Sequence, residues 1–165
     1  MKSLLLLRHA RPSATSPTGR DIDRPLVEEG RAAASHVGQL LRQKQIKPEV
    51  VLSSPAVRAR ETAELVSEAA GLATQTRFDA RIYEASLEEL LQIVSEAEDG
   101  VETLLLVGHN PGLAELLASL TGESAAMSPA TLARIELDIN AWSELRASQA
   151  GRLVFIQPPD ASPGH

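Results

Sequence analysis

Short apolar runs alternate along the chain with longer stretches of helical periodicity. Four runs are too short for helices and have the pattern of strands buried on both faces: Leu4–Leu7, Val50–Leu52, Leu104–Val107 and, more weakly, Thr74–Phe78. Four longer stretches repeat apolar residues at the spacing of an amphipathic helix: 27–45, 56–70, 87–97 and 113–120. Strands that alternate with helices predict a mostly parallel sheet with helices on both of its faces.

The last third of the chain has a different pattern. The segments Thr131–Leu137 and Arg152–Gln157 are strand-like and have no helix of good quality between them, so we expect an antiparallel pair. Ser86 and Glu89 have the spacing of a capping box at the start of the third helix. The expected fold is therefore α/β, a three-layer sandwich whose mostly parallel sheet has an antiparallel edge strand.

Composition limits the classes of protein that this chain can represent. Its 165 residues suit one domain, expected over 1–157 and followed by a loose tail at 158–165 that is rich in proline and small polar residues. The net charge of −6 argues against nucleic acid or an anionic membrane as a partner. The absence of cysteine excludes disulfides and thiolate chemistry. No apolar run reaches the length of a signal peptide or a membrane span, so we expect a cytoplasmic protein.

Charged and polar residues follow three of the predicted strands. Arg8-His9 follow the first strand, the segment 53–58 with Arg58 follows the second, and the segment 108–112 with His109 follows the third clear one. Because the ligand site of such sheets lies at the carboxyl ends of the strands, we expect these residues to meet. Two arginines and two histidines would then gather in an acidic chain, and a phosphoryl group is the simplest ligand for that local charge.

Two dipeptides at these strand ends predict where the next helices begin. Ser54-Pro55 and Asn110-Pro111 each have the pattern of an N-cap followed by proline at the first helical position. We therefore expect two helix N-termini, with free N–H groups, beside the anion. Each residue also has an ordinary structural explanation, because a single arginine at a strand end is usually a surface residue and a single histidine is more often structural than catalytic. The convergence of these arginines and histidines at the ends of three strands favours an anion-binding site.

Other kinds of site are disfavoured. A metal site at His9 and His109 would need a third ligand, and no HExxH, His-x-His or carboxylate cluster supplies one. The chain has no GxxxxGK[ST] loop for nucleotides and no GxSxG elbow for an acyl hydrolase. We therefore expect neither a metal nor another cofactor.

Three blocks and two shorter motifs occur in a fixed order. The blocks are Arg8-His9-Ala10, Ser53-Ser54-Pro55-x-x-Arg58-Ala59-x-x-Thr62-Ala63 and Val107-Gly108-His109-Asn110-Pro111; the motifs are Asp23-Arg24-Pro25-Leu26-x-x-x-Gly30 and Ile82-Tyr83-x-Ala85. Together they span residues 8–112 and resemble the histidine phosphatase superfamily in its branch-1, phosphoglycerate-mutase-like form, with SixA-type phosphohistidine phosphatases as the closest group. Ala10 stands where many members have glycine, which is tolerable if its φ is negative.

The resemblance implies a role for each matching residue. His9 would be the nucleophile that attacks phosphorus and becomes a phosphohistidine, which water then hydrolyses. Arg8, Arg58 and His109 match the positions of the phosphate clamp, which stabilises the transition state electrostatically. Asn110 is a further candidate for phosphate binding. No metal is required where arginines carry the positive charge.

The leaving group and the opening of the site are less defined. Glu84 is the candidate general acid, and the interpretation of Glu84 as a solvent-exposed loop carboxylate without a catalytic role is about equally good. Within a chain of this length the loop Pro12–Arg24 is the long one beside the first strand, so we expect a shallow, open pocket. Arg11, Arg20 and Arg24 could rim this pocket, although ordinary surface charge is the default interpretation for each.

Three functions remain open from the sequence. The first is a phosphatase that acts on phosphohistidine in another protein, such as a histidine phosphotransfer domain, through a covalent phosphohistidine intermediate. The second is a phosphatase of the same chemistry that acts on small phosphomonoesters. The third is a catalytically silent phosphate-binding module, which is disfavoured because His9 and the whole predicted clamp are present.

Overall fold

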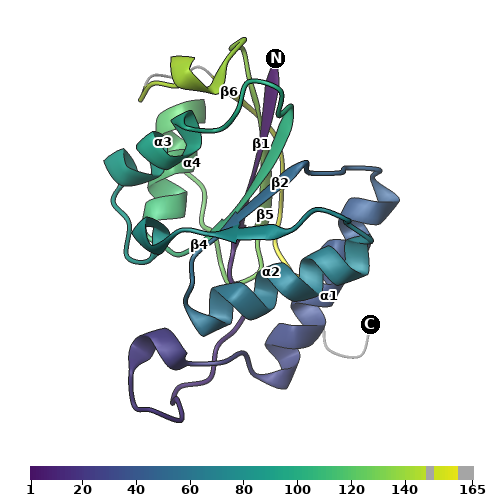
Figure 1. Cartoon of the computed structure of the whole chain (residues 1–165), viewed down its shortest axis with the longest axis vertical. Helices are drawn as coiled ribbons and strands as arrows, with labels where there is room; N and C mark the ends of the chain where they lie inside the picture. The colour runs from purple at the N-terminus through teal and green to yellow at the C-terminus, as the bar shows by residue number, and fades with distance from the viewer. Residues whose placement is uncertain (148–150, 160–165) are drawn as a thin grey trace.

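A six-stranded sheet forms the middle layer of the structure, which a computed structural model describes for residues 1–147 and 151–159 (Figure 1). Its strands are β1 (Lys2–Arg8), β2 (Val50–Ser53), β3 (Thr76–Phe78), β4 (Thr103–Gly108), β5 (Leu132–Leu137) and β6 (Gly151–Gln157). The helices are α1 (Glu28–Gln43), α2 (Val57–Ala70), α3 (Leu87–Ser95) and α4 (Gly112–Thr121), with short 3₁₀ helices η1 (Asp21–Asp23), η2 (Ala80–Ile82) and η3 (Trp142–Glu144). Every predicted helix and strand is present, close to its predicted bounds.

The order of the strands confirms the predicted topology. The sheet runs β3-β2-β4-β1-β5-β6, and neighbours among the first four strands are parallel. β5 runs antiparallel to β1, and β6 pairs with β5 as the predicted antiparallel pair. The antiparallel edge thus consists of two strands, because β5 lies between β1 and the outermost strand β6.

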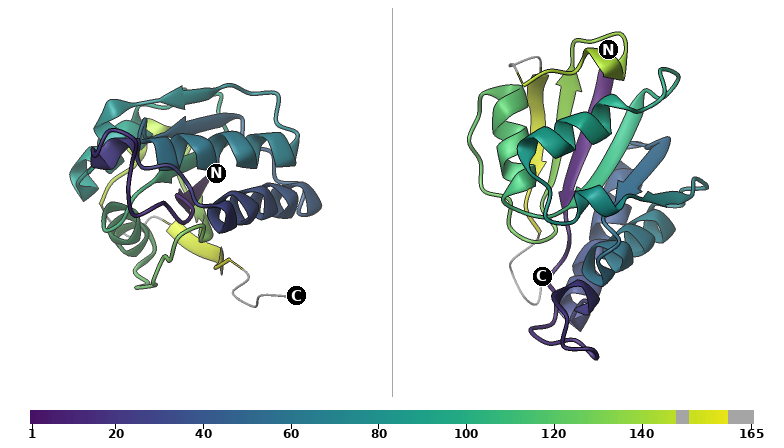
Figure 2. Two further views of the ribbon diagram at one scale, coloured as in Figure 1. Left: turned by 90° about the horizontal axis from the view of Figure 1, so that it is seen from below. Right: turned by 60° about the vertical axis from the view of Figure 1, so that its left-hand side comes forward.

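The leucines of β1 are buried on both faces of the sheet because they serve two separate cores. Leu4 and Leu6 pack into the core under α3 and α4, whereas Leu5 and Leu7 pack into the core under α1 and α2. Figure 2 shows the sheet between these two helical layers. Strand alternation sends successive side chains to opposite faces, so a strand covered on both sides must be apolar throughout. β1 is therefore a rigid central support for the residues that follow it.

The register of the parallel strands aligns their carboxyl ends. Arg8 of β1 pairs with Gly108 of β4, and Ser53 of β2 pairs with Val107 of β4. The loops that follow these three strands therefore begin side by side at one edge of the sheet. The segment between β1 and α1 extends beyond this edge (Figure 1).

Ser86 caps α3 as predicted, but the proline-containing helix starts are different. α2 begins at Val57, so Pro55 does not occupy its first helical position. The Ser54 hydroxyl accepts a hydrogen bond from the Ala56 N–H at 3.1 Å, which makes a turn before the helix. Ser54 does not cap α2, because its hydroxyl is used in this turn and in a contact with the next loop.

The helix start predicted at Asn110-Pro111 also differs in the structure. α4 begins at Gly112, and Pro111, whose peptide bond with Asn110 is cis, precedes the helix. The Asn110 amide donates to the Met127 carbonyl at 2.8 Å and makes no capping bond. Both helices still begin close to the edge where their strands end, α2 two residues and α4 one residue later than the pattern predicts.

The single domain expected over residues 1–157 stays a prediction. The sheet uses residues from Lys2 to Gln157. The tail predicted at 158–165 lies outside the described residues from residue 160 onward. Within the part of the chain that is described, no helix combines the length and the apolar character that crossing a membrane requires.

Candidate active site

His9 stands at the carboxyl end of β1 and is 5% exposed. Its Nδ1 lies 2.8 Å from the Ala10 carbonyl oxygen. Because a carbonyl only accepts hydrogen bonds, Nδ1 carries the proton of the neutral ring, and Nε2 keeps a free lone pair. Burial above all, together with the charges of Arg58, Arg8 and Arg24 and against the opposing effect of the Ala10 carbonyl, lowers the pKa of His9 from 6.5 to about 4. His9 is therefore neutral at pH 7.

His109 lies beside His9, with 5.1 Å between the ring centroids. Its Nε2 is 2.8 Å from the Ser54 hydroxyl, and its buried Nδ1 has no hydrogen-bond partner among the described residues. Burial, followed by His9 and Arg58, lowers the pKa of His109 to about 3. The two predicted histidines thus meet as two neutral rings, and His109 has one ring nitrogen available for a ligand.

Arg8 and Asn110 share one acceptor, the Met127 carbonyl. Arg8 Nη1 donates to it at 3.1 Å and Asn110 Nδ2 at 2.8 Å. The Arg8 Nε and the Asn110 Oδ1 are buried without partners. Burial, together with Arg58, lowers the pKa of Arg8 from its ordinary value. The loop before β5 therefore holds both side chains in the site; phosphate binding by Asn110 stays a prediction.

Arg58 lies in the first turn of α2 and is 6% exposed. Its Nη1 donates to the Asp21 main-chain carbonyl at 2.8 Å and its Nη2 to Asp21 Oδ2 at 3.0 Å. The Tyr83 hydroxyl donates to the same Oδ2 at 2.6 Å. These bonds, that of Tyr83 first, lower the pKa of Asp21 to about 2, and Asp21 in turn raises the pKa of Tyr83 to about 12.

The three arginines expected to carry ordinary surface charge have different positions. Arg11 and Arg20 form exposed ion pairs with carboxylates, as that default predicts. Arg24 differs, because it is close enough to His9 to lower the pKa of that ring, and its Nε donates to Asp21 Oδ1 at 3.1 Å. Arg24 therefore belongs to the electrostatic surroundings of the site.

Glu84 lies at the mouth of the site. It is exposed, has a positive φ of 58°, and contributes to the raised pKa of the neighbouring Tyr83. Tyr83 itself packs edge-on against His109 with 5.5 Å between the ring centroids. The structure thus places Glu84 near the cluster without burying it, and its role as general acid stays a prediction.

Several supporting residues were not recognised as part of the site from the sequence. Thr62 accepts from the Ala10 N–H at 3.0 Å and donates to the Arg58 carbonyl at 2.7 Å, which joins the end of β1 to α2. Thr62 and Tyr83 occur in the motifs of the resemblance, so a signal for them existed. Asp21 lies just before one of those motifs, and nothing in the local pattern indicates its partners.

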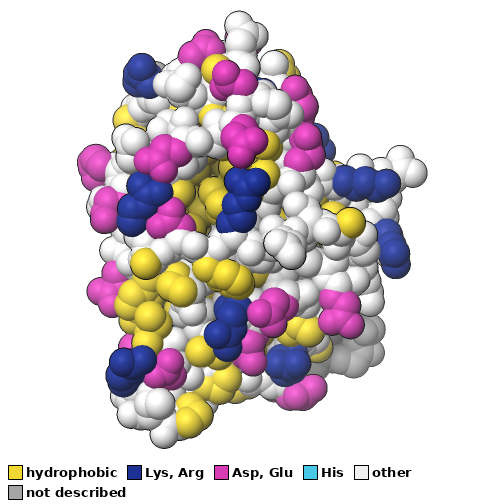
Figure 3. All heavy atoms as spheres, viewed as in Figure 1, with side chains coloured by type: hydrophobic (Ala, Val, Ile, Leu, Met, Phe, Trp, Pro, Cys, Tyr) yellow, Lys and Arg dark blue, Asp and Glu magenta, His cyan; other side chains and the backbone are white. Residues whose placement is uncertain are grey.

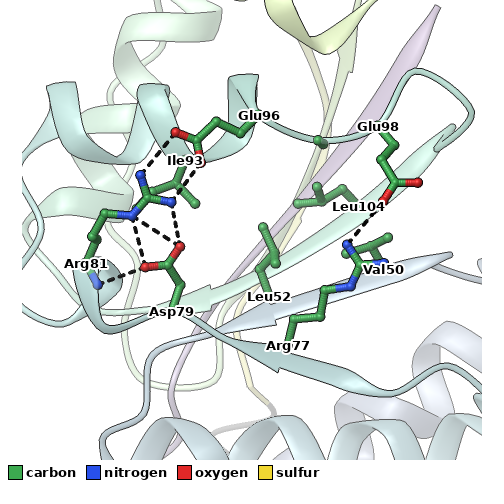
Figure 4. Close-up of a pocket in the computed structure, with 10 residues that line it drawn as sticks. Val50, Leu52, Arg77, Asp79, Arg81, Ile93, Glu96, Glu98 and Leu104 are labelled. Carbon is green, nitrogen blue, oxygen red and sulfur yellow. Dashed lines mark hydrogen bonds and ion pairs between the residues drawn. The ribbon is translucent and has the colours of Figure 1, made fainter.

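A pocket with a volume of about 150 Å³ lies between the sheet and α3, away from the cluster around His9, and none of the predicted site residues lines it (Figure 4). Arg81 in this pocket is paired with Asp79 and Glu96, and Arg77 is paired with Glu98. Figure 3 shows basic and acidic side chains interspersed on this face of the molecule. Its arginines are therefore already neutralised and do not form a second phosphate clamp.

Among the residues that the structure describes, no three side chains of histidine, aspartate or glutamate gather in a way that could hold a metal ion. The site brings together His9, Arg8, Arg58 and His109, as the sequence predicts, and adds Asp21, Tyr83 and Arg24. Two neutral histidines, one with a free Nε2 lone pair, thus face guanidinium groups. Such an arrangement can bind a dianionic phosphoryl group and attack it.

Comparison with known proteins identifies the class. Residues 4–99 match the family model of the histidine phosphatase superfamily (branch 1), and the chain belongs to this superfamily, whose members are phosphatases.

Three similar proteins illustrate the relationship. The chain is 31% identical to an uncharacterised chloroplastic protein of Arabidopsis thaliana over 98% of this chain and 79% of that protein. It is 29% identical to a phosphohistidine phosphatase SixA homolog of Haemophilus influenzae, over 94% of this chain and 99% of that protein. A solved structure assigned as a phosphohistidine phosphatase SixA, from Nakamurella multipartitia, superposes with a TM-score of 0.85 at 28% identity, over 97% of each chain. The fold is thus that of SixA-type histidine phosphatases.

Proposed function

We propose that this chain hydrolyses phosphohistidine in another protein through a covalent intermediate on His9. The observation that carries the proposal is the tautomer of His9, because the Ala10 carbonyl holds the proton on Nδ1 and leaves Nε2 free for attack. The lowered pKa, about 4, keeps this ring neutral and nucleophilic at pH 7.

The reaction divides into two displacements at phosphorus. Nε2 of His9 attacks, the bond from phosphorus to the substrate nitrogen breaks, and its electron pair goes to the leaving imidazole. Water then attacks phospho-His9, the bond from phosphorus to Nε2 breaks and returns its electron pair to the His9 ring, and inorganic phosphate leaves as the attacking water gives up a proton to solvent. Arg8 and Arg58 stabilise the charge on the equatorial oxygens in both steps, as such a loose transition state requires.

His109 contributes a neutral hydrogen-bond donor to this clamp. The Ser54 oxygen already accepts from the Ala56 N–H, and its own proton is available for His109 Nε2. When Ser54 donates to Nε2, the imidazole proton lies on Nδ1, the nitrogen that has no protein partner. His109 then donates to a phosphoryl oxygen without being charged, in agreement with its lowered pKa.

The leaving group favours protein phosphohistidine over small phosphomonoesters as the substrate. Glu84 is exposed, so a strong enzymic acid is not evident, and an imidazole that is already protonated on its other nitrogen can leave without one. The similarity to a SixA homolog supports the same choice. A small-molecule phosphatase of the same chemistry is the alternative, and action in the cytoplasm and independence of metal ions stay predictions.

The decisive experiment compares substrates directly. The wild-type chain is assayed on a phosphorylated histidine phosphotransfer domain and on a panel of metabolite phosphates, each with and without EDTA, and with His9→Ala as the blank. We expect the phosphorylated domain to have the highest kcat/KM and EDTA to have no effect. A metabolite phosphate that is turned over more efficiently would replace the proposed substrate, and loss of activity in EDTA would contradict a metal-independent mechanism.

A further inference from the structure

The loop before α1 places a carboxylate against the arginines of the site. Asp21 accepts from Arg58 through its main-chain carbonyl and through Oδ2, and Arg24 donates to Oδ1 at 3.1 Å. The Asp21 side chain is 54% exposed, so the carboxylate faces both the arginines and the solvent. Its lowered pKa keeps it negative at neutral pH.

The charges around His9 balance one phosphoryl group. Three guanidinium groups, those of Arg8, Arg24 and Arg58, and the single carboxylate of Asp21 leave two positive charges beside two neutral histidines. A phosphoryl dianion neutralises this surplus. Two further arginines at this end of the molecule are committed to carboxylates in exposed pairs, Arg11 with Glu29 and Arg20 with Asp23. Among the described residues, a second anionic group on the substrate would therefore meet Asp21 with no unpaired cation beside it to offset the repulsion.

Asp21 also borders the space next to the phosphate site. It lines an open hollow of about 630 Å³, together with Arg24 and with Ala14, Thr15, Ser16, Gly19 and Arg20 of the same loop. The hollow can accommodate the part of a substrate that lies beyond the phosphoryl group. The charge of a substituent held there is consequently felt by the Asp21 carboxylate.

We propose that Asp21 determines specificity: it disfavours substrates with a second anionic group near the phosphorus and favours those whose neighbouring group is neutral or cationic. The inference rests on the proposed function and deepens it, because a phosphohistidine whose imidazole is protonated on its second nitrogen carries a positive charge at this position. The Asp21 carboxylate stabilises that cationic form. Breakage of the phosphorus–nitrogen bond then returns the electron pair to the ring and releases neutral imidazole, while the phosphoryl group passes to His9 Nε2.

A series of aryl phosphates tests the charge preference alone. The probes are 4-methylphenyl, 4-carboxyphenyl and 4-(aminomethyl)phenyl phosphate, which have similar size and carry a neutral, an anionic and a cationic substituent. The wild-type chain should prefer the cationic probe over the anionic one in kcat/KM. Asp21→Asn should reduce that ratio by about tenfold, the scale of one charge–charge interaction in a partly exposed site. Asp99→Asn, which makes the same charge change in the exposed loop before β4, at the opposite edge of the sheet, should leave the ratio unchanged.

The ratio of kcat/KM between the cationic and the anionic probe distinguishes a specificity role of Asp21 from a role in positioning Arg58. If Asp21 only positioned Arg58, the Asp21→Asn variant would lose the same factor on all three probes, and an unchanged ratio would overturn the proposal. An equal fall in the ratio for Asp99→Asn would do so as well, because it would indicate a general effect of net charge. Failure of the proposed function appears in a different measurement, the turnover of the phosphorylated domain by the wild-type chain.

Discussion

His9 is fixed at the level of single atoms. The Ala10 carbonyl selects its tautomer, and the Thr62 hydroxyl holds the Ala10 N–H. In the described part of the chain, the imidazole beside it is that of the partly buried His109, whose Nε2 is held by Ser54. In the proposed mechanism, one nitrogen atom, Nε2 of His9, therefore attacks phosphorus.

Replacement of this nucleophile should stop the reaction. We expect His9→Ala to lower turnover at least about a thousandfold and to abolish the acid-labile, alkali-stable phosphoenzyme, because electrostatic assistance alone leaves little rate. Quenched-flow labelling with a phosphorylated substrate measures both. A phosphoenzyme that persists in the variant would mean that another residue attacks phosphorus.

The clamp residues should each contribute one transition-state donor. Arg58→Ala and His109→Ala are expected to lower kcat by about 10²–10³ and to weaken inhibition by vanadate, since both interactions strengthen as charge develops on the equatorial oxygens. Arg77→Ala is the control, because Arg77 is exposed on β3 and paired with Glu98. Full activity of either clamp variant would remove that residue from the proposed mechanism.

The role of Glu84 depends on the leaving group. If it is a general acid, Glu84→Gln should slow hydrolysis of an alkyl phosphate far more than that of phosphohistidine, for which we expect a loss within about tenfold. Steady-state rates on both substrates distinguish the roles. Equal and severe losses would indicate a positioning residue, and no loss on either would indicate an exposed loop carboxylate.

Among the elements, the pair α1 and α2 packs most closely where α1 has a glycine. A Cβ on Gly38 would lie 2.5 Å from the Val66 carbonyl oxygen and 2.6 Å from the Ala69 Cβ. The close approach lets α1 cover the same face of the sheet as α2, whose first turn carries Arg58. A side chain here must separate the helices or distort them.

The Gly38→Ala substitution should therefore destabilise the protein. We expect the free energy of unfolding to fall by about 1–2 kcal/mol, because overpacking outweighs the better helix propensity of alanine. Gly100→Ala is the matched control, since a Cβ at Gly100 meets no atom within 4 Å. Urea denaturation of both variants measures the difference, and an equally stable Gly38→Ala variant would show that the two helices can separate at no cost.

For the whole molecule, the buried His9 and the partly buried His109 couple stability to pH. Their pKa values are lowered from 6.5, to about 4 for His9 and about 3 for His109, so the fold favours the neutral rings. Below pH 6.5 the unfolded chain binds protons that the folded chain does not, and the free energy of unfolding must fall as the pH decreases toward 4. Asp21 affects stability at lower pH, because its contribution to the free energy of unfolding is lost only as the pH falls from its ordinary pKa of 3.8 to about 2.

Removal of the two rings should flatten this dependence. We expect the double variant His9→Asn/His109→Asn to lose less stability than the wild-type chain between pH 6.5 and pH 4.5. Urea denaturation at several pH values measures the slope for each protein. An identical slope in the two proteins would show that other groups carry the proton linkage in this range.

The amino-acid sequence determined the architecture and the core of the site. Leu4–Leu7 predicts a central strand covered on both faces, since only such a strand is apolar at every position. The chemistry follows from topology, because the carboxyl ends of parallel strands share one edge of the sheet and Arg8, His9 and His109 each lie there. Both inferences need only local patterns and the rule that orders strands and helices.

Only the tertiary structure decided how the side chains are paired. Ser54 and Asn110 have the local pattern of N-caps, but they bond to His109 and Met127, because a polar side chain takes the partner that folding brings within reach. Asp21 is 37 residues from Arg58 in the chain, and no periodicity encodes a contact at that separation. The proton on His9 Nδ1 likewise depends on where the Ala10 carbonyl points. The charge of the site and the nucleophilic nitrogen are therefore properties of the folded molecule, since both arise from distances that the chain acquires on folding.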